Sequence, residues 1–432
     1  MLIIPPPSPE VVRGRSVAHP LLLRGPRLPD GRIEDVAIAG GVIVSVGGDP
    51  AGRPPPQVLD LRGYLLLPSL VEPHAHLPLA GPVTGAGELS GHAAGLDRWA
   101  AAAPGLVPAD IATLAWSKAA RYLAAGTTAI RVHVDVGKES GLQAVGALLE
   151  VRAGLAGILD IQIVAAVSGP LTGLAGAARC ALLRQALAAG ADLAGSGPGL
   201  GDGTGRAVEA LAVTAASAGV GIDLHIGAAA GLEPGSLGRL AAIARAGFGY
   251  PLTVSHLASL GAKRKEQRRM TRSLADAGIG VVVVPRSAPF RPGADLGSAA
   301  PADPRGPSVV RELLAAGVPV AAGGGPHAAS GRAEYTDPLG TASELVAGRL
   351  TPAEAIIAIG AGGRRIMRLP DVEVVPGSPA DLVAIRAPDL WDAVASRAAD
   401  RIVLRGGQVV ARNIAVADLS RQERAVAMSA WN

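Results

Sequence analysis

Three features of the 432-residue sequence predict an α/β fold: a TIM-type (β/α)8 barrel with a small β-sandwich domain built from both termini. Both ends of the chain contain short β-type runs separated by turn residues. The middle alternates β-branched apolar runs with helical stretches rich in Ala, Leu and Arg, which is typical of parallel βαβ units. There are eight such units, and no glycine-rich phosphate-binding sequence follows the first, so a barrel is favoured over an open doubly wound sheet.

The two terminal regions are expected to meet in one small sheet domain. Turn signals such as Pro-Asp-Gly, Gly-Gly and Arg405-Gly406-Gly407 separate their short apolar runs. The expected strands are Leu21–Leu23, Asp35–Ala39, Val42–Val46, Val58–Leu61, Asp381–Ile385, Arg401–Leu404 and Gln408–Ala411. We therefore assign residues 1–65 and 371–432 to the β-sandwich, and residues 66–370 to the barrel.

Eight apolar runs in the middle of the chain are the expected barrel strands. They are Tyr64–Ser69, Thr128–Val134, Ile158–Val167, Ala191–Gly195, Gly221–His225, Leu252–His256, Gly280–Val284 and Pro319–Gly323. The glycine-rich segment Gly195–Gly205 follows the fourth strand and lacks the Lys-Ser/Thr of a phosphate-binding loop. It is interpreted as a loop over the mouth of the barrel.

Composition excludes several other classes of protein. The 40 basic and 36 acidic residues leave a formal charge of only +4, and ten aromatic residues offer little for base stacking, so nucleic acid is not an expected partner. The dense basic run Lys263–Arg269 is interpreted as a solvated helix face. No apolar run reaches the length of a membrane span, and the N-terminal sequence does not resemble a secretion signal. A cytoplasmic protein without a membrane partner is expected.

Four of the eight histidines fall at the carboxyl ends of expected barrel strands. His74 and His76 form a His-x-His pair after the first strand, and alternation along an extended backbone directs both side chains to one side. His225 ends the fifth strand and His256 ends the sixth. A barrel assembles its active site at these strand ends, and imidazoles that converge there can hold zinc, iron or another borderline metal.

Other interpretations of these residues stay open. The four histidines could be unrelated core or surface residues. His133, at the end of the second strand, could line the pocket or donate a hydrogen bond from behind it.

A series of longer motifs extends the pattern over nearly the whole chain. In order, these are PSLVEPHAHL, GLDRWA, IRVHVDV, ILDIQIVA, IDLHIGA, TVSHLAS, SVVRELLAAGVPVAAG, DPLGTASELV, VVPGSPADLVAIRA and VLRGGQVVAR. Together they resemble the cytosine deaminase branch of the amidohydrolase superfamily. The resemblance implies a small heterocyclic substrate, hydrolysis of a C–N bond by a metal-activated water, and a homo-oligomer.

The resemblance also implies roles for individual residues. His74, His76 and His225 would bind one divalent metal, zinc or iron, and His256 would be the catalytic histidine that polarises the nucleophile. In the family, a strand-eight aspartate completes the metal site, and a glutamate three residues after the strand-five histidine moves protons.

The chain departs from the family at three positions. The glutamate position is Ala228, the aspartate position is about Gly325, and the substrate-binding glutamine position is near Ser168. Alanine and glycine can neither ligate a metal nor transfer a proton. Candidate substitutes, as ligands or as acid and base, lie in the loops after strands five and eight: Glu233, His327, Glu334 and Asp337.

These departures leave two functional hypotheses. One is a divergent hydrolase of C–N bonds in small cyclic nitrogenous compounds, for which ordinary cytosine deamination is not expected. General acid–base assistance contributes ~10²–10⁴ in rate per positioned group, so the missing carboxylates matter. The other is an inactive homologue that serves as a binding or scaffolding subunit.

Overall fold

A computed structural model of the chain describes residues 20–48, 57–77, 107–136, 139–197, 205–226, 234–256, 264–285, 309–324 and 336–413. Eight parallel strands form one sheet in the order β13-β12-β11-β10-β9-β8-β7-β6. They are β6 (Leu70–Ala75), β7 (Thr127–Asp135), β8 (Asp160–Val167), β9 (Leu193–Ser196), β10 (Gly221–His225), β11 (Leu252–Ser255), β12 (Gly280–Val283) and β13 (Val320–Ala322). The sheet curls into a nearly closed barrel, and the predicted TIM-type fold is confirmed.

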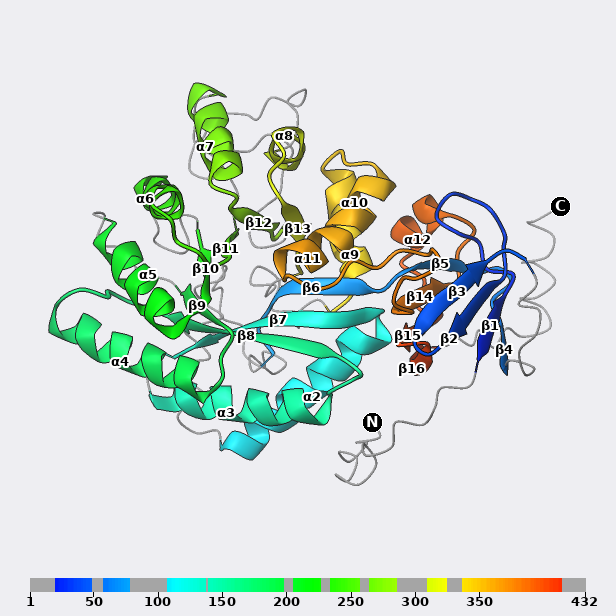
Figure 1. The fold of residues 1–432 in the computed structure, drawn as a ribbon, viewed down its shortest axis with the longest axis horizontal. Coiled ribbons are helices and arrows are strands. Elements are labelled where there is room, and N and C mark those ends of the chain that lie inside the picture. The colour runs from blue at the N-terminus through cyan, green and yellow to red at the C-terminus, as the bar shows by residue number, and fades with distance from the viewer. Residues whose placement is uncertain are drawn as a thin grey trace, which may run out of the picture.

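Helices connect successive barrel strands on the outside of the barrel (Figure 1). They are α2 (Pro108–Ala124), α3 (Glu139–Gly154), α4 (Gly173–Ala189), α5 (Arg206–Ala218), α6 (Pro234–Arg245), α7 (Arg264–Asp276) and α8 (Val309–Ala315). Three more helices follow the last barrel strand, α9 (Pro338–Ala347), α10 (Pro352–Ala358) and α11 (Ala361–Ile366), and α12 (Leu390–Ser396) lies between two strands of the small domain. Local sequence explains several boundaries. Helix α4 ends at Gly190, whose φ of 117° is costly for other residues, and α10 begins with a Thr351–Glu354 capping box.

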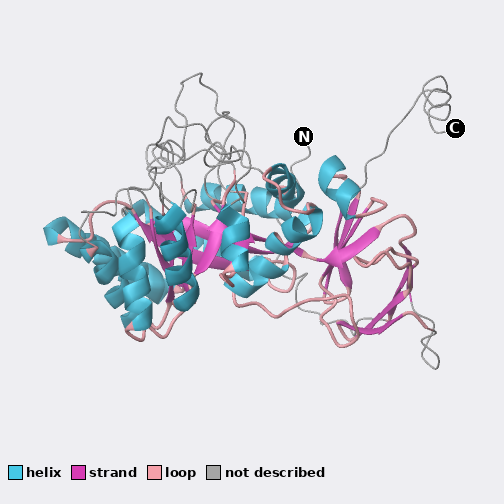
Figure 2. Cartoon of the chain, turned by 90° about the horizontal axis from the view of Figure 1, so that it is seen from above, coloured by secondary structure: helices cyan, strands magenta, loops and turns pink. Residues whose placement is uncertain are grey.

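Two four-stranded sheets form the small domain beside the barrel (Figure 2). One has the order β3-β2-β1-β4, from β1 (Leu21–Arg24), β2 (Val36–Ala39), β3 (Val42–Val46) and β4 (Gln57–Asp60). The other has the order β16-β15-β14-β5, from β5 (Leu65–Pro68), β14 (Leu382–Ile385), β15 (Arg401–Arg405) and β16 (Gln408–Asn413). One apolar cluster joins side chains from both ends of the chain, such as Leu23, Ile43, Leu382 and Leu404. The two terminal regions therefore meet in a separate small sheet domain.

The prediction for the first barrel strand is wrong. The run 64–69 does not enter the barrel, because Leu65–Pro68 pairs antiparallel with β14 in the small domain. The barrel strand is the next run, Leu70–Ala75, which is buried throughout. The switch occurs at Pro68 and Ser69: proline has no N–H to continue a ladder, and the Ser69 amide donates to Asp381 of the small domain. His74 therefore lies within its strand, and His76 directly follows it.

The first and last barrel strands are joined by a side chain. No backbone ladder between β6 and β13 is present among the described residues, but the Glu72 carboxylate accepts hydrogen bonds from the amides of His74 and Gly324, each at 2.9 Å. A Cβ on Gly323 would lie 2.5 Å from Oε1 of Glu72, so glycine leaves room for this contact. Glu72 thereby holds together the two strands between which the barrel would otherwise be open.

Among the described residues, no helix combines the length and apolar character needed to cross a membrane.

Candidate metal centre

The His-x-His pair lies at the carboxyl end of β6. His74 and His76 are two residues apart, so alternation directs both side chains to one face, whereas a register shift separates Glu72 from this alternation. All three are buried, with exposed fractions of 0–3% for the two histidines. Their ring centroids are 5.2 Å apart.

Two further histidines reach the same place from β10 and β11. The ring of His225, the last residue of β10, lies 4.7 Å from that of His74, and its amide donates to Ser196 Oγ. His256 follows β11, and its Nε2 lies 2.8 Å from Nε2 of His74. The φ of His256 is +63°, a left-handed conformation that non-glycine residues rarely adopt. Strain of this kind is typical of functional sites and is maintained by the surrounding structure.

The donor set fits a borderline divalent metal. Each of His74, His76 and His225 offers one ring nitrogen, and these nitrogens lie within 4.8 Å of one another. Nδ1 of His74 has no hydrogen-bond partner among the described residues although it is buried, which is costly unless a ligand occupies the site. Three imidazoles that converge in this way match the histidine ligands of catalytic zinc sites.

Burial keeps these imidazoles in the form that binds metals. Desolvation, reinforced by neighbouring histidines, holds the pKa of His74 well below its usual value. Burial lowers the pKa of His225 to about 4, against the carboxylates of Asp223 and Asp135, which raise it. Neutral imidazole is the metal-binding form, so the cluster is ready to bind metal at neutral pH without releasing protons.

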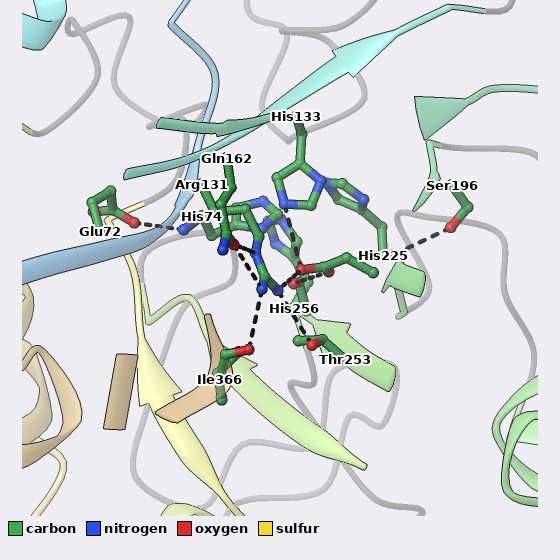
Figure 3. Close-up of polar contacts among 12 residues, drawn as sticks. Glu72, His74, Arg131, His133, Gln162, Ser196, His225, Thr253, His256 and Ile366 are labelled. Atoms are coloured by element: carbon green, nitrogen blue, oxygen red, sulfur yellow. Dashed lines mark hydrogen bonds and ion pairs between the residues drawn. The ribbon is translucent and has the colours of Figure 1, made fainter. Parts of the chain in front are cut away.

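A fully paired polar layer lies next to the histidines (Figure 3). All five N–H donors of Arg131 are used: two bonds go to Gln162, one to Asp223 at 2.8 Å, one to Thr253 and one to the Ile366 carbonyl. The other carboxylate oxygen of Asp223 accepts from Ser255. Arg131 and Asp223 are 1% and 0% exposed, so this is a buried ion pair with nearly ideal partners.

The two expected pocket residues lie at the same end of the barrel. His133 is one alternation step beyond Arg131 on β7, and its ring is 4.2 Å from that of His74 and 4.6 Å from that of His225. Neither ring nitrogen of His133 has a hydrogen-bond partner among the described residues. Ser168 directly follows β8, and its hydroxyl faces Gly197 beyond β9, where a Cβ would collide with it. His133 therefore lies at the cluster, and Ser168 lies at the same end of the barrel.

Of the four candidate substitutes for the missing carboxylates, one lies within the described residues. Glu233, His327 and Glu334 lie outside the described residues, as do Ala228 and Gly325. That candidate is Asp337, and its contacts place it away from the histidine cluster.

Asp337 caps α9 and accepts two hydrogen bonds from Arg401, which also donates to the carbonyl of Ala125, just before β7 begins. This is the amino end of the barrel strands, opposite the histidines. The structure does not bring Asp337 to the cluster.

Sequence reasoning missed three buried charged residues around the site. Glu72, Arg131 and Asp223 each stand two residues before a histidine, and Arg131 and Asp223 share the face of that histidine on their strands. This spacing was a usable signal, because a charged residue inside an apolar strand requires a buried partner.

Comparisons with known proteins agree with this architecture. No family model matches the chain. Over 418 residues it is 27% identical to a pterin deaminase of Rhizobium rhizogenes, a match that covers 88% of each chain. It is also similar to the solved N-isopropylammelide isopropylaminohydrolase of Burkholderia multivorans, with 29% identity, a TM-score of 0.73, and coverage of 92% of this chain and 100% of that one.

More distant structures share the fold. The 5-methylcytosine deaminase of Klebsiella pneumoniae has 22% identity and a TM-score of 0.75, over 93% of this chain and 99% of that one. A zinc-complexed atrazine chlorohydrolase of Arthrobacter aurescens has 19% identity and a TM-score of 0.66, over 95% and 99%. The homologues and structural neighbours are thus amidohydrolase-superfamily deaminases and hydrolases, so the predicted resemblance to that superfamily is confirmed, and its cytosine-deaminase-like branch is consistent with them.

Proposed function

From its kinship with amidohydrolase-superfamily deaminases and hydrolases, we propose that this chain is a metal-dependent hydrolase of a C–N bond in a small cyclic nitrogenous compound. The observation that carries the proposal is the convergence of the buried side chains of His74, His76 and His225 on one point at the carboxyl end of the barrel strands. Its relatives are named for substrates of this kind, namely pterin, 5-methylcytosine and N-isopropylammelide.

The three histidines would hold one divalent ion, zinc or iron. When bound, such an ion lowers the pKa of a water molecule towards neutrality and so supplies a nucleophile. His256, whose Nε2 lies 2.8 Å from His74, would orient this water and polarise it. The polar layer of Arg131 and Asp223 behind the cluster would fix the barrel strands that carry the histidines.

The protein would act on a substrate other than cytosine. Ala228 and Gly325 stand where the resemblance places the proton-shuttling glutamate and the strand-eight aspartate, so the usual proton path of a cytosine deaminase is not available. The same two positions favour the second candidate function, an inactive homologue that binds a small molecule or a partner subunit.

Ammonia or amine release separates the two functions. The metal-free protein, the protein with one equivalent of Zn²⁺ or Fe²⁺, and a His225→Ala variant would be assayed with pterins, aminopyrimidines and N-alkylamino-triazines. We expect metal-dependent turnover of one class, with a loss of ~10³-fold or more in the variant, since its metal site is incomplete. Absence of turnover in every combination would contradict the proposal and support a binding role.

A further inference from the structure

We propose that Asp135, at the carboxyl end of β7, supplies the substrate-facing carboxylate of this site and so replaces the acidic side chains absent at Ala228 and Gly325. This assignment deepens the proposed function and rests on it.

The direction of the Asp135 side chain follows from the two faces of β7. Arg131 and His133 point into the barrel, as their contacts with Asp223 and with the histidine rings demonstrate. The intervening residues Ile130, Val132, Val134 and Val136 are all part of the apolar core around the sheet. Asp135 is two residues beyond His133 and pairs in register with Ala166 of β8, so alternation places it on the inner face.

Contacts across the barrel come in successive layers. Arg131 pairs with Asp223 of β10, and one step further along both strands His133 lies 4.6 Å from His225. The next layer, about 6.6 Å towards the mouth at the usual rise of a parallel strand, contains Asp135. Its counterpart on β10, position 227, is outside the described residues. The third layer therefore carries a carboxylate directly above the metal-binding layer.

Exposure also suits a role in contact with substrate. Arg131 and His133 are 1% and 2% exposed, whereas Asp135 is only partly buried, the first residue on this face of β7 that solvent reaches. A partly exposed carboxylate one layer beyond His133 and His225 is placed to contact both the attacking water and a ring substrate.

The proposed chemistry balances without a further reactant. Water adds its oxygen to the ring carbon while one of its protons passes to a carboxylate oxygen of Asp135. As the C–N bond breaks, the same proton passes from Asp135 to the leaving nitrogen, and the carboxylate returns to its ionised form. The products are the hydroxylated ring, or its keto tautomer, and ammonia or an amine.

The test compares Asp135→Asn with Asp135→Glu and with Asp371→Asn, a control that removes an exposed carboxylate from the segment after α11. Three quantities are measured: bound metal, kcat, and the pH midpoint of the visible spectrum of the Co²⁺-loaded protein, which needs no substrate. For Asp135→Asn we expect one bound metal, a kcat lower by ~10²-fold or more, and a midpoint lower by about 0.5 pH unit or more, because a nearby negative charge is removed. Asp135→Glu should recover part of kcat, and Asp371→Asn should match the wild type.

Other outcomes overturn the assignment. If Asp135→Asn keeps kcat within about three-fold of the wild type, the carboxylate has no part in proton transfer. A lower kcat with an unchanged Co²⁺ midpoint would mean that Asp135 acts on the fold and not at the site. If the wild-type chain hydrolyses nothing, the proposed function fails by itself. The Co²⁺ midpoint then decides whether Asp135 faces the metal site, and an unchanged midpoint refutes it.

Discussion

Two adjacent layers of the barrel interior are equally buried and differ in how their polar atoms are paired. In the Arg131–Asp223 layer, every guanidinium donor and both carboxylate oxygens have partners. In the histidine layer, Nδ1 of His74 and both ring nitrogens of His133 make no hydrogen bond among the described residues. Burial without partners is costly, so it persists where a ligand provides the missing bonds. The first layer is thus built for stability, and the second for binding.

The largest expected effect is on the paired layer. Asp223→Asn removes the counter-ion of a buried guanidinium, and the free energy of unfolding should fall by about 3–5 kcal/mol. Combining it with Arg131→Met should recover at least ~1 kcal/mol, because the unpaired charge disappears. Urea unfolding of the metal-free proteins measures both. If Asp223→Asn lowers the free energy of unfolding by less than about 1 kcal/mol, the paired layer does not have the stabilising role assigned to it.

The histidine layer should respond to pH instead. The pKa of His225 is about 4 in the folded protein and about 6.5 when unfolded, so the unfolded chain binds more protons between these values. Stability of the metal-free protein should therefore fall as the pH drops from 6.5 to 4, by roughly 2–3 kcal/mol from His225 alone. Urea unfolding of wild type and His225→Gln across this range isolates the contribution. Identical pH dependence of the two proteins would contradict it.

Substitution of Glu72, which links His74 to the end of β13, should have a smaller effect on the free energy of unfolding. Glu72→Gln keeps the shape but places an amide donor against one backbone N–H, which should cost about 1–2 kcal/mol. Metal affinity should fall by about 10–100-fold, as for other groups that orient ligands. Competition with a chelator measures the affinity. Unchanged metal affinity in this variant would show that Glu72 does not position His74.

Much of this architecture could be predicted from local sequence. Each apolar run of strands two to eight is followed by a helical stretch, and this alternation identifies the strands. The histidines could be located because the fold class alone brings strand ends together. The first strand could not be placed correctly, because LLLPSLVEPHA is one continuous apolar run, and only tertiary pairing decides that it divides at Pro68 and Ser69.

The polar interior was harder to predict. Arg131 and Asp223 are 92 positions apart, and nothing local states that they meet. Asp135 was not predicted, because the resemblance places the carboxylates of the family on strands five and eight. Alternation along β7 would have revealed it, since Arg131, His133 and Asp135 share one face.

Anomalous diffraction at the zinc edge, from crystals grown with one equivalent of Zn²⁺, tests the metal centre most directly. The account predicts one peak, about 2.0–2.1 Å from ring nitrogens of His74, His76 and His225. It also predicts that the peak disappears in crystals of a His74→Ala, His76→Ala double variant. No peak at the cluster, or a peak elsewhere in the barrel, would contradict it.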